Sequence, residues 1–155
     1  MSDFDIRDIR FGEDVTAEDV AGDLEFLDDW EERYRYIIDL GKQLPAMPEA
    51  LRTEEHFVRG CQSQVWLVTD FDADASKLYL GVDSDALIVR GLAAIVLTAL
   101  NRKTPEQVVG YDMDGYFERL DLIRHLSLTR GNGLRSMVAR IKHEAEQLSA
   151  ATPHP

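Results

Sequence analysis

Cysteine is the scarcest residue in this chain, because the 155 residues contain only Cys61. A single cysteine excludes an internal disulfide and favours a reducing compartment, so we expect the protein in the cytosol. It also excludes an iron–sulfur cluster held by this chain alone, because such a cluster requires several thiolates. The four histidines form no pair at metal-ligand spacing. We therefore expect no bound metal and no cofactor.

Long apolar runs are missing as well. No stretch of about 18 apolar residues occurs, so we expect no membrane-spanning helix. The first five residues are acidic and contain no extended apolar segment, so we expect no signal peptide. The acidic run at 70–74 resembles the start of a calcium loop, but the glycine and the glutamate required later in such a loop are absent. We interpret that run as a polar turn.

Basic residues are scarce in the first part of the chain. Residues 1–32 contain thirteen Asp and Glu but only two Arg, a net charge of −11, and the whole chain carries −12. Binding to nucleic acid requires clustered Lys and Arg, so nucleic acid is a poor candidate for a partner. The acidic segment has two interpretations: a solvated surface, or a docking segment for a basic partner.

The remaining composition is that of one globular domain, because 155 residues are enough to bury a core without a disulfide or metal. We expect a flexible acidic extension over residues 1–15. A single domain is expected over residues 16–149, followed by a disordered tail over residues 150–155.

Hydrophobic periodicity predicts several helices. The expected helical segments are 16–27, 30–43, 86–101, 105–110, 114–124 and 134–148. Thr16 and Thr104 are the expected N-caps of two of them, and the Asp-Ser-Asp run at 83–85 is expected to cap the central helix, mainly through Asp85. Gly91 within that helix predicts a close approach to a strand. Residues 127–133 are expected to form a loop.

Alternating apolar residues predict two strands with one well-buried face, at 65–71 and 78–82. A polar turn joins them into an antiparallel hairpin. The short segment 57–59 is expected to add an edge strand. The expected fold class is therefore α+β, with a small antiparallel three-stranded sheet packed against helices.

The stretch Gly60-Cys61-Gln62-Ser63-Gln64 is the place where the sequence suggests chemistry. A free cysteine is often an inert small hydrophobe, but the neighbours of Cys61 are polar or small. They predict a thiol presented at a loop tip, with Gly60 allowing a sharp bend. Arg59 is the nearest cation, and it is expected to lower the pKa of Cys61 somewhat from about 8.5.

Several ordered motifs span residues 30–148. They are Trp30-Glu31-Glu32-Arg33-Tyr34, Ile37-Ile38-Asp39-Leu40-Gly41, Leu44-Pro45, Gly60-Cys61-Gln62-Ser63-Gln64-Val65-Trp66, Asp83-Ser84-Asp85-Ala86, Val89-Arg90-Gly91-Leu92, Thr104-Pro105, His125-Leu126, Arg130 and Gly133-Leu134. In their order and density they make the chain resemble the SufE family, including its CsdE branch. The family pattern Ser-Arg-Ser-x-Gly-Leu reads Thr-Arg-Gly-Asn-Gly-Leu at 129–134, and the arginine is kept.

The resemblance implies a SufE/IscU-like α+β fold and a sulfur-acceptor function. A PLP-dependent cysteine desulfurase, of the SufS or CsdA type, would transfer sulfane sulfur from its own persulfide to Cys61. Cys61 would carry the persulfide to an iron–sulfur scaffold complex, and the chain would speed desulfurase turnover. PLP and the cluster would belong to these partners. The chain would then be a sulfurtransferase-type accessory protein rather than a stand-alone enzyme.

The residues expected to shape the loop or contact a partner are Arg59, Gly60, Gln62, Ser63, Gln64, Asp85, His125 and Arg130. Two other functions stay open. One is an adaptor that activates a desulfurase by shape alone. The other is a cysteine hydrolase with His56 or His125 as its base, although no catalytic signature surrounds Cys61. The sequence also does not determine the oligomeric state, and a homodimer is one of the open alternatives.

Overall fold

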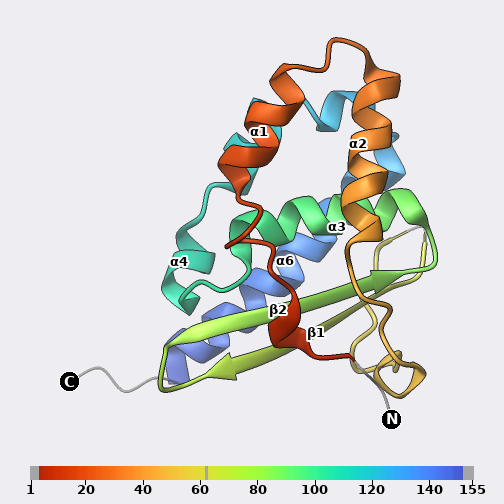
Figure 1. Cartoon of the computed structure of the whole chain (residues 1–155). Helices are drawn as coiled ribbons and strands as arrows, with labels where there is room; N and C mark the ends of the chain where they lie inside the picture. Colours follow the sequence, from red (N-terminus) through yellow and green to blue (C-terminus); the bar gives the residue numbers. More distant parts are fainter. Residues whose placement is uncertain (1–3, 62, 152–155) are drawn as a thin grey trace.

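Helices pack around one antiparallel hairpin in this protein (Figure 1). The computed structural model describes residues 4–61 and 63–151. Strand β1 spans Val65–Asp72 and strand β2 spans Lys77–Ser84. Val65 pairs with Ser84 at one end and Asp72 pairs with Lys77 at the other. The predicted hairpin and the α+β class are therefore confirmed.

The expected third strand at 57–59 is wrong, because this segment makes only an isolated bridge with β1. The Val58 amide donates to the Val65 carbonyl and the Leu67 amide donates to the His56 carbonyl, each at 2.8 Å. Gly60 then adopts a φ of +90°, which turns the chain away from the sheet. A positive φ interrupts the extended backbone that a longer ladder requires.

Six α-helices lie in the described residues. They are α1 (Ala17–Glu25), α2 (Trp30–Lys42), α3 (Leu87–Leu100), α4 (Pro105–Gly110), α5 (Met113–Arg119) and α6 (Leu128–Ala151). Thr16 and Thr104 each form a capping box, with Asp19 and Gln107 respectively, so both predicted N-caps are confirmed. None of the helices in this part of the chain is long and apolar enough to cross a membrane.

Helix α6 begins at Leu128, so the predicted loop at 127–133 is wrong. The Ser127 hydroxyl accepts a hydrogen bond from the Arg130 amide at 3.2 Å, as the N-cap residue of a helix does. Gly131 and Gly133 each lower helix stability by about 1 kcal/mol in isolation. Both are buried against neighbouring segments of the chain, and this packing outweighs their low helix propensity.

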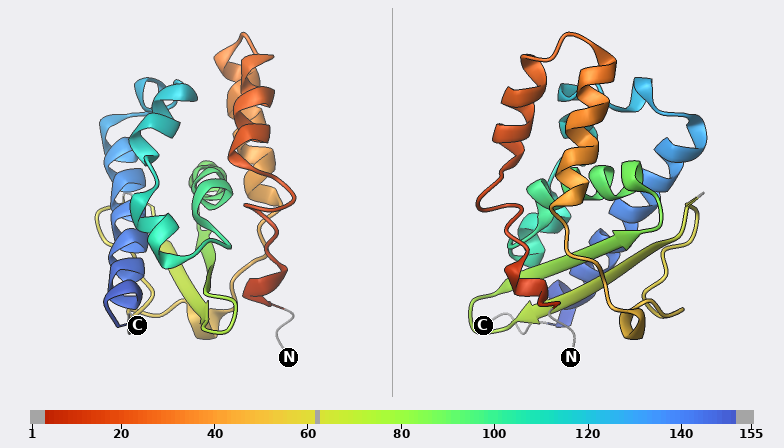
Figure 2. Two further views of the ribbon diagram at one scale, coloured as in Figure 1. Left: turned by 90° about the vertical axis from the view of Figure 1, so that its left-hand side faces the viewer. Right: turned by 45° about the vertical axis from the view of Figure 1, so that its right-hand side comes forward.

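Helix α3 lies at the centre of the molecule. Helices α1 and α2 lie on one side of it, α6 lies on the other, and the hairpin runs along its edge (Figure 2). Gly91 does make a close approach, but to helix α2 and not to a strand as expected. A Cβ at Gly91 would collide with the Ile37 carbonyl, and a Cβ at Gly41 would press on the Gly91 backbone. Spacing along one helix does not reveal which element packs on it, which is why the expected partner was wrong.

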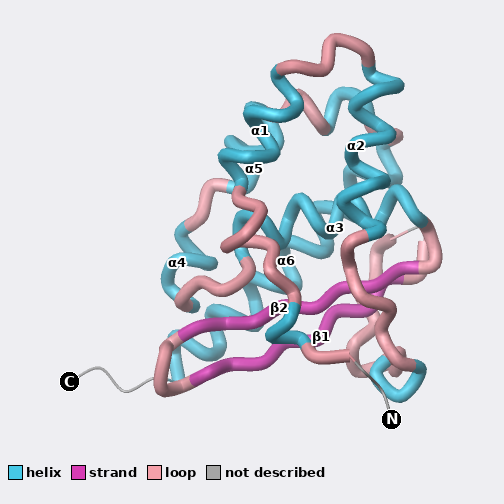
Figure 3. The backbone as a smooth tube through the Cα atoms, in the orientation of Figure 1, coloured by secondary structure: helices cyan, strands magenta, loops and turns pink. Residues whose placement is uncertain are grey.

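Both faces of the hairpin are covered, whereas the alternation of apolar residues predicted one buried face. Leu67 and Leu80 belong to the main core with the helices. Trp66 and Val68 belong to a second cluster on the opposite face, against which Phe4 packs. The covering segments come from the N-terminus and from the loop-rich region before β1, which lie beside the strands (Figure 3).

Residues 4–15 pack on the core as a segment that we call the N-terminal strap. Ile9 and Phe11 are only 3% and 5% exposed. The buried Asn101 side chain donates to the carbonyls of both residues, at 3.2 and 2.9 Å, and its oxygen accepts from the Leu80 amide at 2.8 Å. Two apolar side chains and one buried amide therefore anchor the strap to the body of the protein. The flexible extension that the acidic composition suggested over residues 1–15 stays a prediction.

Candidate functional site

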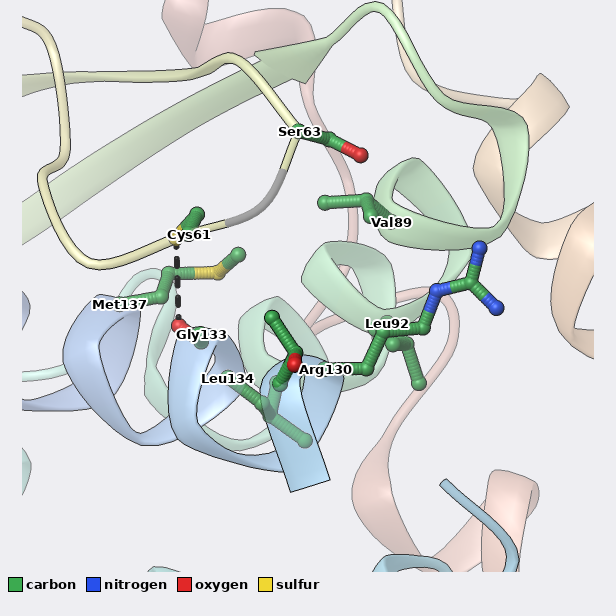
Figure 4. A pocket seen from close by; sticks show the side chains of 9 residues that line it. Cys61, Ser63, Val89, Leu92, Arg130, Gly133, Leu134 and Met137 are labelled. Carbon is green, nitrogen blue, oxygen red and sulfur yellow. Dashed lines mark hydrogen bonds between the residues drawn. The ribbon is translucent and has the colours of Figure 1, made fainter. Parts of the chain in front are cut away.

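The thiol of Cys61 lies in a small pocket between helices α3 and α6 (Figure 4). The side chain is half-buried, and Sγ donates a hydrogen bond to the Gly133 carbonyl of α6 at 3.4 Å. The residues that line the pocket are Cys61, Ser63, Val89, Leu92, Thr129, Arg130, Gly133, Leu134 and Met137. The walls are mainly aliphatic, so the pocket suits a neutral sulfur atom better than an ion.

Most of the pocket walls come from positions that the sequence assigned to helix faces, whereas Gly133 belonged to the loop predicted at 127–133. Val89 and Leu92 lie on α3, and Gly133, Leu134 and Met137 lie on α6. Their spacing is that of any core-facing helix stripe. No signal in the sequence separates these wall positions from ordinary core positions, because the pocket forms only where two distant segments meet.

The loop that carries Cys61 is fixed at both ends. At its start, Gly60 has positive φ, and a Cβ there would lie only 2.7 Å from the Ser136 hydroxyl oxygen. Glycine is therefore required for both the conformation and the space. At its end, the Gln64 amide donates to Asp85 Oδ1 at 3.0 Å. Gln62, which was also expected to act in this loop, lies outside the described residues.

The expected capping of α3 by Asp85 is wrong. The N-cap position is Ala86, which makes no side-chain cap. The Ser84 hydroxyl accepts from the Ala86 amide at 3.2 Å, while Asp85 accepts from Gln64 across the loop. An acidic residue before a helix can bond to a more distant amide as easily as to the helix itself, and here the tertiary contact prevails.

Asp83 forms a buried ionic network next to this loop. Its carboxylate accepts hydrogen bonds from the Met47 amide at 2.7 Å and from Arg52 at 2.9 Å, and Arg90 Nε lies 3.2 Å away. A carboxylate that is only 1% exposed requires such partners, because burial of an unpaired charge is very costly. The network fixes the end of β2 that leads into Asp85, and it thereby supports the Cys61 loop.

Burial raises the pKa of the Cys61 thiol above its usual value. The expectation that Arg59 would lower this pKa is therefore wrong. The Arg59 guanidinium pairs with Glu54 at 3.1 Å, and both side chains are more than 80% exposed. In the conformation described here, burial therefore favours the neutral thiol of Cys61 near pH 7.

Arg130 is the cation that lines the Cys61 pocket. It lies in the first turn of α6, where the unpaired amides of a helix carry partial positive charge. Its guanidinium makes no hydrogen bond and no ion pair with any described residue, so it remains available to an anion. The sequence pointed to Arg130 as a partner contact, and the fold brings it to the edge of the thiol pocket.

Neither candidate histidine lines this pocket. His56 Nδ1 lies 2.8 Å from the Leu51 carbonyl, and the His125 ring stacks on Trp30 with ring centroids 4.2 Å apart. The pocket therefore supplies no histidine base among the described residues, and a hydrolase mechanism gains no support from its geometry. A partner contact by His125 stays a prediction.

The fold and the site define a class: small α+β proteins that hold one half-buried thiol in an apolar pocket, beside an arginine. The chain belongs to the SufE family. The SufE domain, described as an Fe–S metabolism associated domain, matches residues 18–145. This membership supports a sulfur-acceptor role in Fe–S metabolism and implies a cysteine desulfurase as partner.

Relatives and a solved structure agree with this assignment. An uncharacterized SufE-like protein of Rhizobium meliloti is 52% identical over 134 residues, which are 85% of this chain and 96% of the relative. A second one, of Rhizobium etli, is 48% identical over 139 residues, 88% of this chain and 94% of the relative. The solution structure of a hypothetical protein from Thermus thermophilus has a TM-score of 0.70 at 18% identity, covering 87% of this chain and 96% of that one, and supports the fold alone.

Proposed function

We propose that Cys61 accepts sulfane sulfur from a PLP-dependent cysteine desulfurase, carries it as a persulfide and passes it to an iron–sulfur scaffold complex. The observation that carries this proposal is the placement of the chain's only cysteine in an apolar pocket next to Arg130. No second cysteine exists in the chain to resolve the persulfide into an internal disulfide. A lone free thiol also suits the reducing cytosol, in which we place the reaction.

The transfer is a thiol exchange between two sulfurs. The Cys61 thiolate attacks the outer sulfur of the desulfurase persulfide, a new S–S bond forms at Cys61, and the electron pair of the broken bond returns to the desulfurase cysteine as a thiolate. The reaction needs no oxidant or reductant. It does need the thiolate, because a neutral thiol is a poor nucleophile in such exchange.

Activation therefore requires Cys61 to leave its resting position. The neutral thiol donates to the Gly133 carbonyl, whereas a thiolate cannot donate and would be repelled by the carbonyl oxygen. Ionisation and outward movement of the loop are thus coupled. Arg130, at the edge of the same pocket, provides a positive charge for the sulfur anion during the exchange.

The desulfurase would dock around the mouth of the pocket. Leu87 and Leu128 begin helices α3 and α6, shortly before the pocket residues Val89 and Thr129 in the sequence, and these two leucines are 50% and 79% exposed. Large exposed aliphatic side chains at the edge of a functional pocket favour a protein partner over bulk water. Docking there would bring the desulfurase persulfide to the loop that carries Cys61.

The test is to incubate the protein with its desulfurase and L-cysteine and to measure the intact mass. Wild type should gain one sulfur atom, and Cys61→Ser should gain none and should fail to stimulate desulfurase turnover. Circular dichroism of Cys61→Ser checks that it folds. If this variant still stimulates turnover fully, the protein is an adaptor that activates its partner by shape, and the carrier mechanism is wrong.

A further inference from the structure

Residues 26–29 join helices α1 and α2, and we call this segment the α1–α2 turn. It carries Phe26, which is 87% exposed and is the most exposed large apolar residue in the part of the chain that the structure describes. The turn lies at one end of the molecule, and the turn of the hairpin lies at the other (Figure 1). Burial of an aromatic ring against a partner is favourable, because it removes a large apolar area from water. Phe26 therefore has the properties of an anchor for another protein.

Exposed acidic side chains flank this ring in the sequence. They are Asp23, Glu25, Asp28, Asp29, Glu31 and Glu32. Glu31 pairs with Arg35 at 3.0 Å. The side chains of Glu25, Asp28 and Glu32 make no hydrogen bond and no ion pair with any other described residue. Their charge is therefore not neutralised within the chain, and a surface rich in Lys and Arg would complement it.

A row of side chains connects the α1–α2 turn with the start of α6. Trp30, the first residue of α2, stacks on His125 with an angle of 17° between the rings. His125 lies three positions before Leu128, which is 79% exposed and begins α6 one position before the pocket residue Thr129. A protein that docks at the mouth of the Cys61 pocket can therefore extend its contact over the stacked rings to the turn.

Resting on the proposed carrier function, we infer that the α1–α2 turn is a second contact for the cysteine desulfurase, separate from the Cys61 pocket. Phe26 packs against apolar side chains of the enzyme, and the acidic side chains that flank it face Lys and Arg. None of these residues lines the Cys61 pocket. The contact therefore contributes to the affinity and the rate of association, and it takes no part in the sulfur exchange itself.

The experiment titrates the desulfurase with the full-length protein. Calorimetry measures the dissociation constant, and a turnover assay measures the maximal stimulation at saturation. Phe26→Ser should weaken binding about tenfold, because an aromatic anchor carries much of the affinity of an interface. Phe26→Tyr keeps the ring and should bind like wild type. Both variants should reach the wild-type maximal stimulation, and both should unfold in urea like wild type, because the ring is exposed.

Charge reversal tests the acidic part of the contact. Asp28→Lys should weaken binding several-fold at low salt and should reduce the dependence of binding on ionic strength, because salt screens charge pairs. Asp74→Lys is the matched control. Asp74 is an exposed acid in the turn of the hairpin, at the other end of the molecule, and its reversal changes the net charge by the same amount. This variant should bind like wild type.

Unchanged binding of Phe26→Ser, or equal effects of Asp28→Lys and Asp74→Lys, would overturn the inference. The sulfur content of Cys61, measured by intact mass in the same mixtures, separates the two proposals. If Phe26→Ser weakens binding but wild type gains no sulfur, the second contact holds and the carrier function fails. If wild type gains sulfur but Phe26→Ser binds equally well, the carrier function holds and the second contact fails.

Discussion

At the scale of single residues, Cys61 needs different surroundings as a resting thiol and as a reactive thiolate. The pocket and the Gly133 carbonyl stabilise the protonated thiol, which suits storage. The proposed sulfur exchange requires the thiolate, which suits a position near Arg130 and the partner. The loop can serve both states only if it moves, and the Gln64–Asp85 contact is the hydrogen bond that restrains it at the end nearest β1.

The first prediction concerns the pH dependence of Cys61. Because burial raises its pKa, alkylation by iodoacetamide should rise with pH around a midpoint above the usual 8.5 or so, while the urea-unfolded chain should titrate near that usual value. The unfolded chain then loses its proton first, so the stabilisation present below about pH 8.5 declines as pH rises through the folded pKa. Arg59→Ala should leave the midpoint unchanged, and a midpoint below 8.5 would contradict the buried thiol.

The second prediction concerns Asp85. Asp85→Ala leaves the Gln64 amide without its acceptor, and the loss of a hydrogen bond contributing about 1 kcal/mol should favour loop opening about fivefold. Cys61 should then react with iodoacetamide about fivefold faster at fixed pH. Asp85→Asn keeps an oxygen acceptor and should stay near the wild-type rate. An unchanged rate in the alanine variant would show that this contact does not restrain the loop.

At the scale of elements, the contact between α2 and α3 places the site. Gly41 and Gly91 allow the two helix backbones to touch, and the first turns of α3 then carry Arg90 to Asp83 and Val89 to the Cys61 pocket. A methyl group added at either glycine would push the two helices apart, and the side chains that α3 places at the site would then move. The position of the pocket wall therefore depends on a contact that lies outside the pocket.

The third prediction tests this helix contact. Gly91→Ala should lower the unfolding free energy by about 2–3 kcal/mol, because the methyl group meets the Ile37 backbone, even though alanine is the better helix former. Urea unfolding measures this change. Gly22→Ala in α1 meets no neighbouring atom within 4 Å and should raise stability by up to about 1 kcal/mol. Equal effects of the two substitutions would refute the close approach.

At the scale of the whole molecule, the N-terminal strap adds a cover to the hairpin. It lies entirely before residue 18, where the match to the SufE domain begins. Arg7 reaches Asp70 and Asp72 at 3.0 and 3.3 Å, so the strap also offsets acidic charge on β1. None of its residues lines the Cys61 pocket. Its contacts therefore predict a role in stability and not in sulfur transfer.

The fourth prediction follows from the buried side chains of the strap. Removal of residues 1–15 exposes the sites of Ile9 and Phe11 and should lower the unfolding free energy by about 3–5 kcal/mol, with sulfur acceptance kept where the protein is still folded. Phe11→Ala provides a milder version in case the truncated chain does not fold. Asp8→Asn removes an exposed acid and should leave stability nearly unchanged. Truncation without loss of stability would favour a solvated tail instead.

Much of the local structure could be predicted from the sequence, because it depends on neighbours three or four residues away. The capping boxes at Thr16 and Thr104 are of this kind. The hairpin was also predictable, because its two strands follow one another in the sequence and are joined by a short polar turn. Predictions failed where a distant contact prevailed over a local preference. Gly131 and Gly133 favoured a loop in the sequence, but both lie in α6, because they pack on Ile123 and Cys61 respectively.

The sequence by itself determined which thiol is the candidate for sulfur chemistry, since a chain with one cysteine leaves no other. Only the tertiary structure decided the state of that thiol. Its partner Gly133 is 72 positions away, and the acceptor for Gln64 is 21 positions away. The pKa of a thiol and the space around it depend on the atoms that surround it, and folding brings those atoms together from separate parts of the chain.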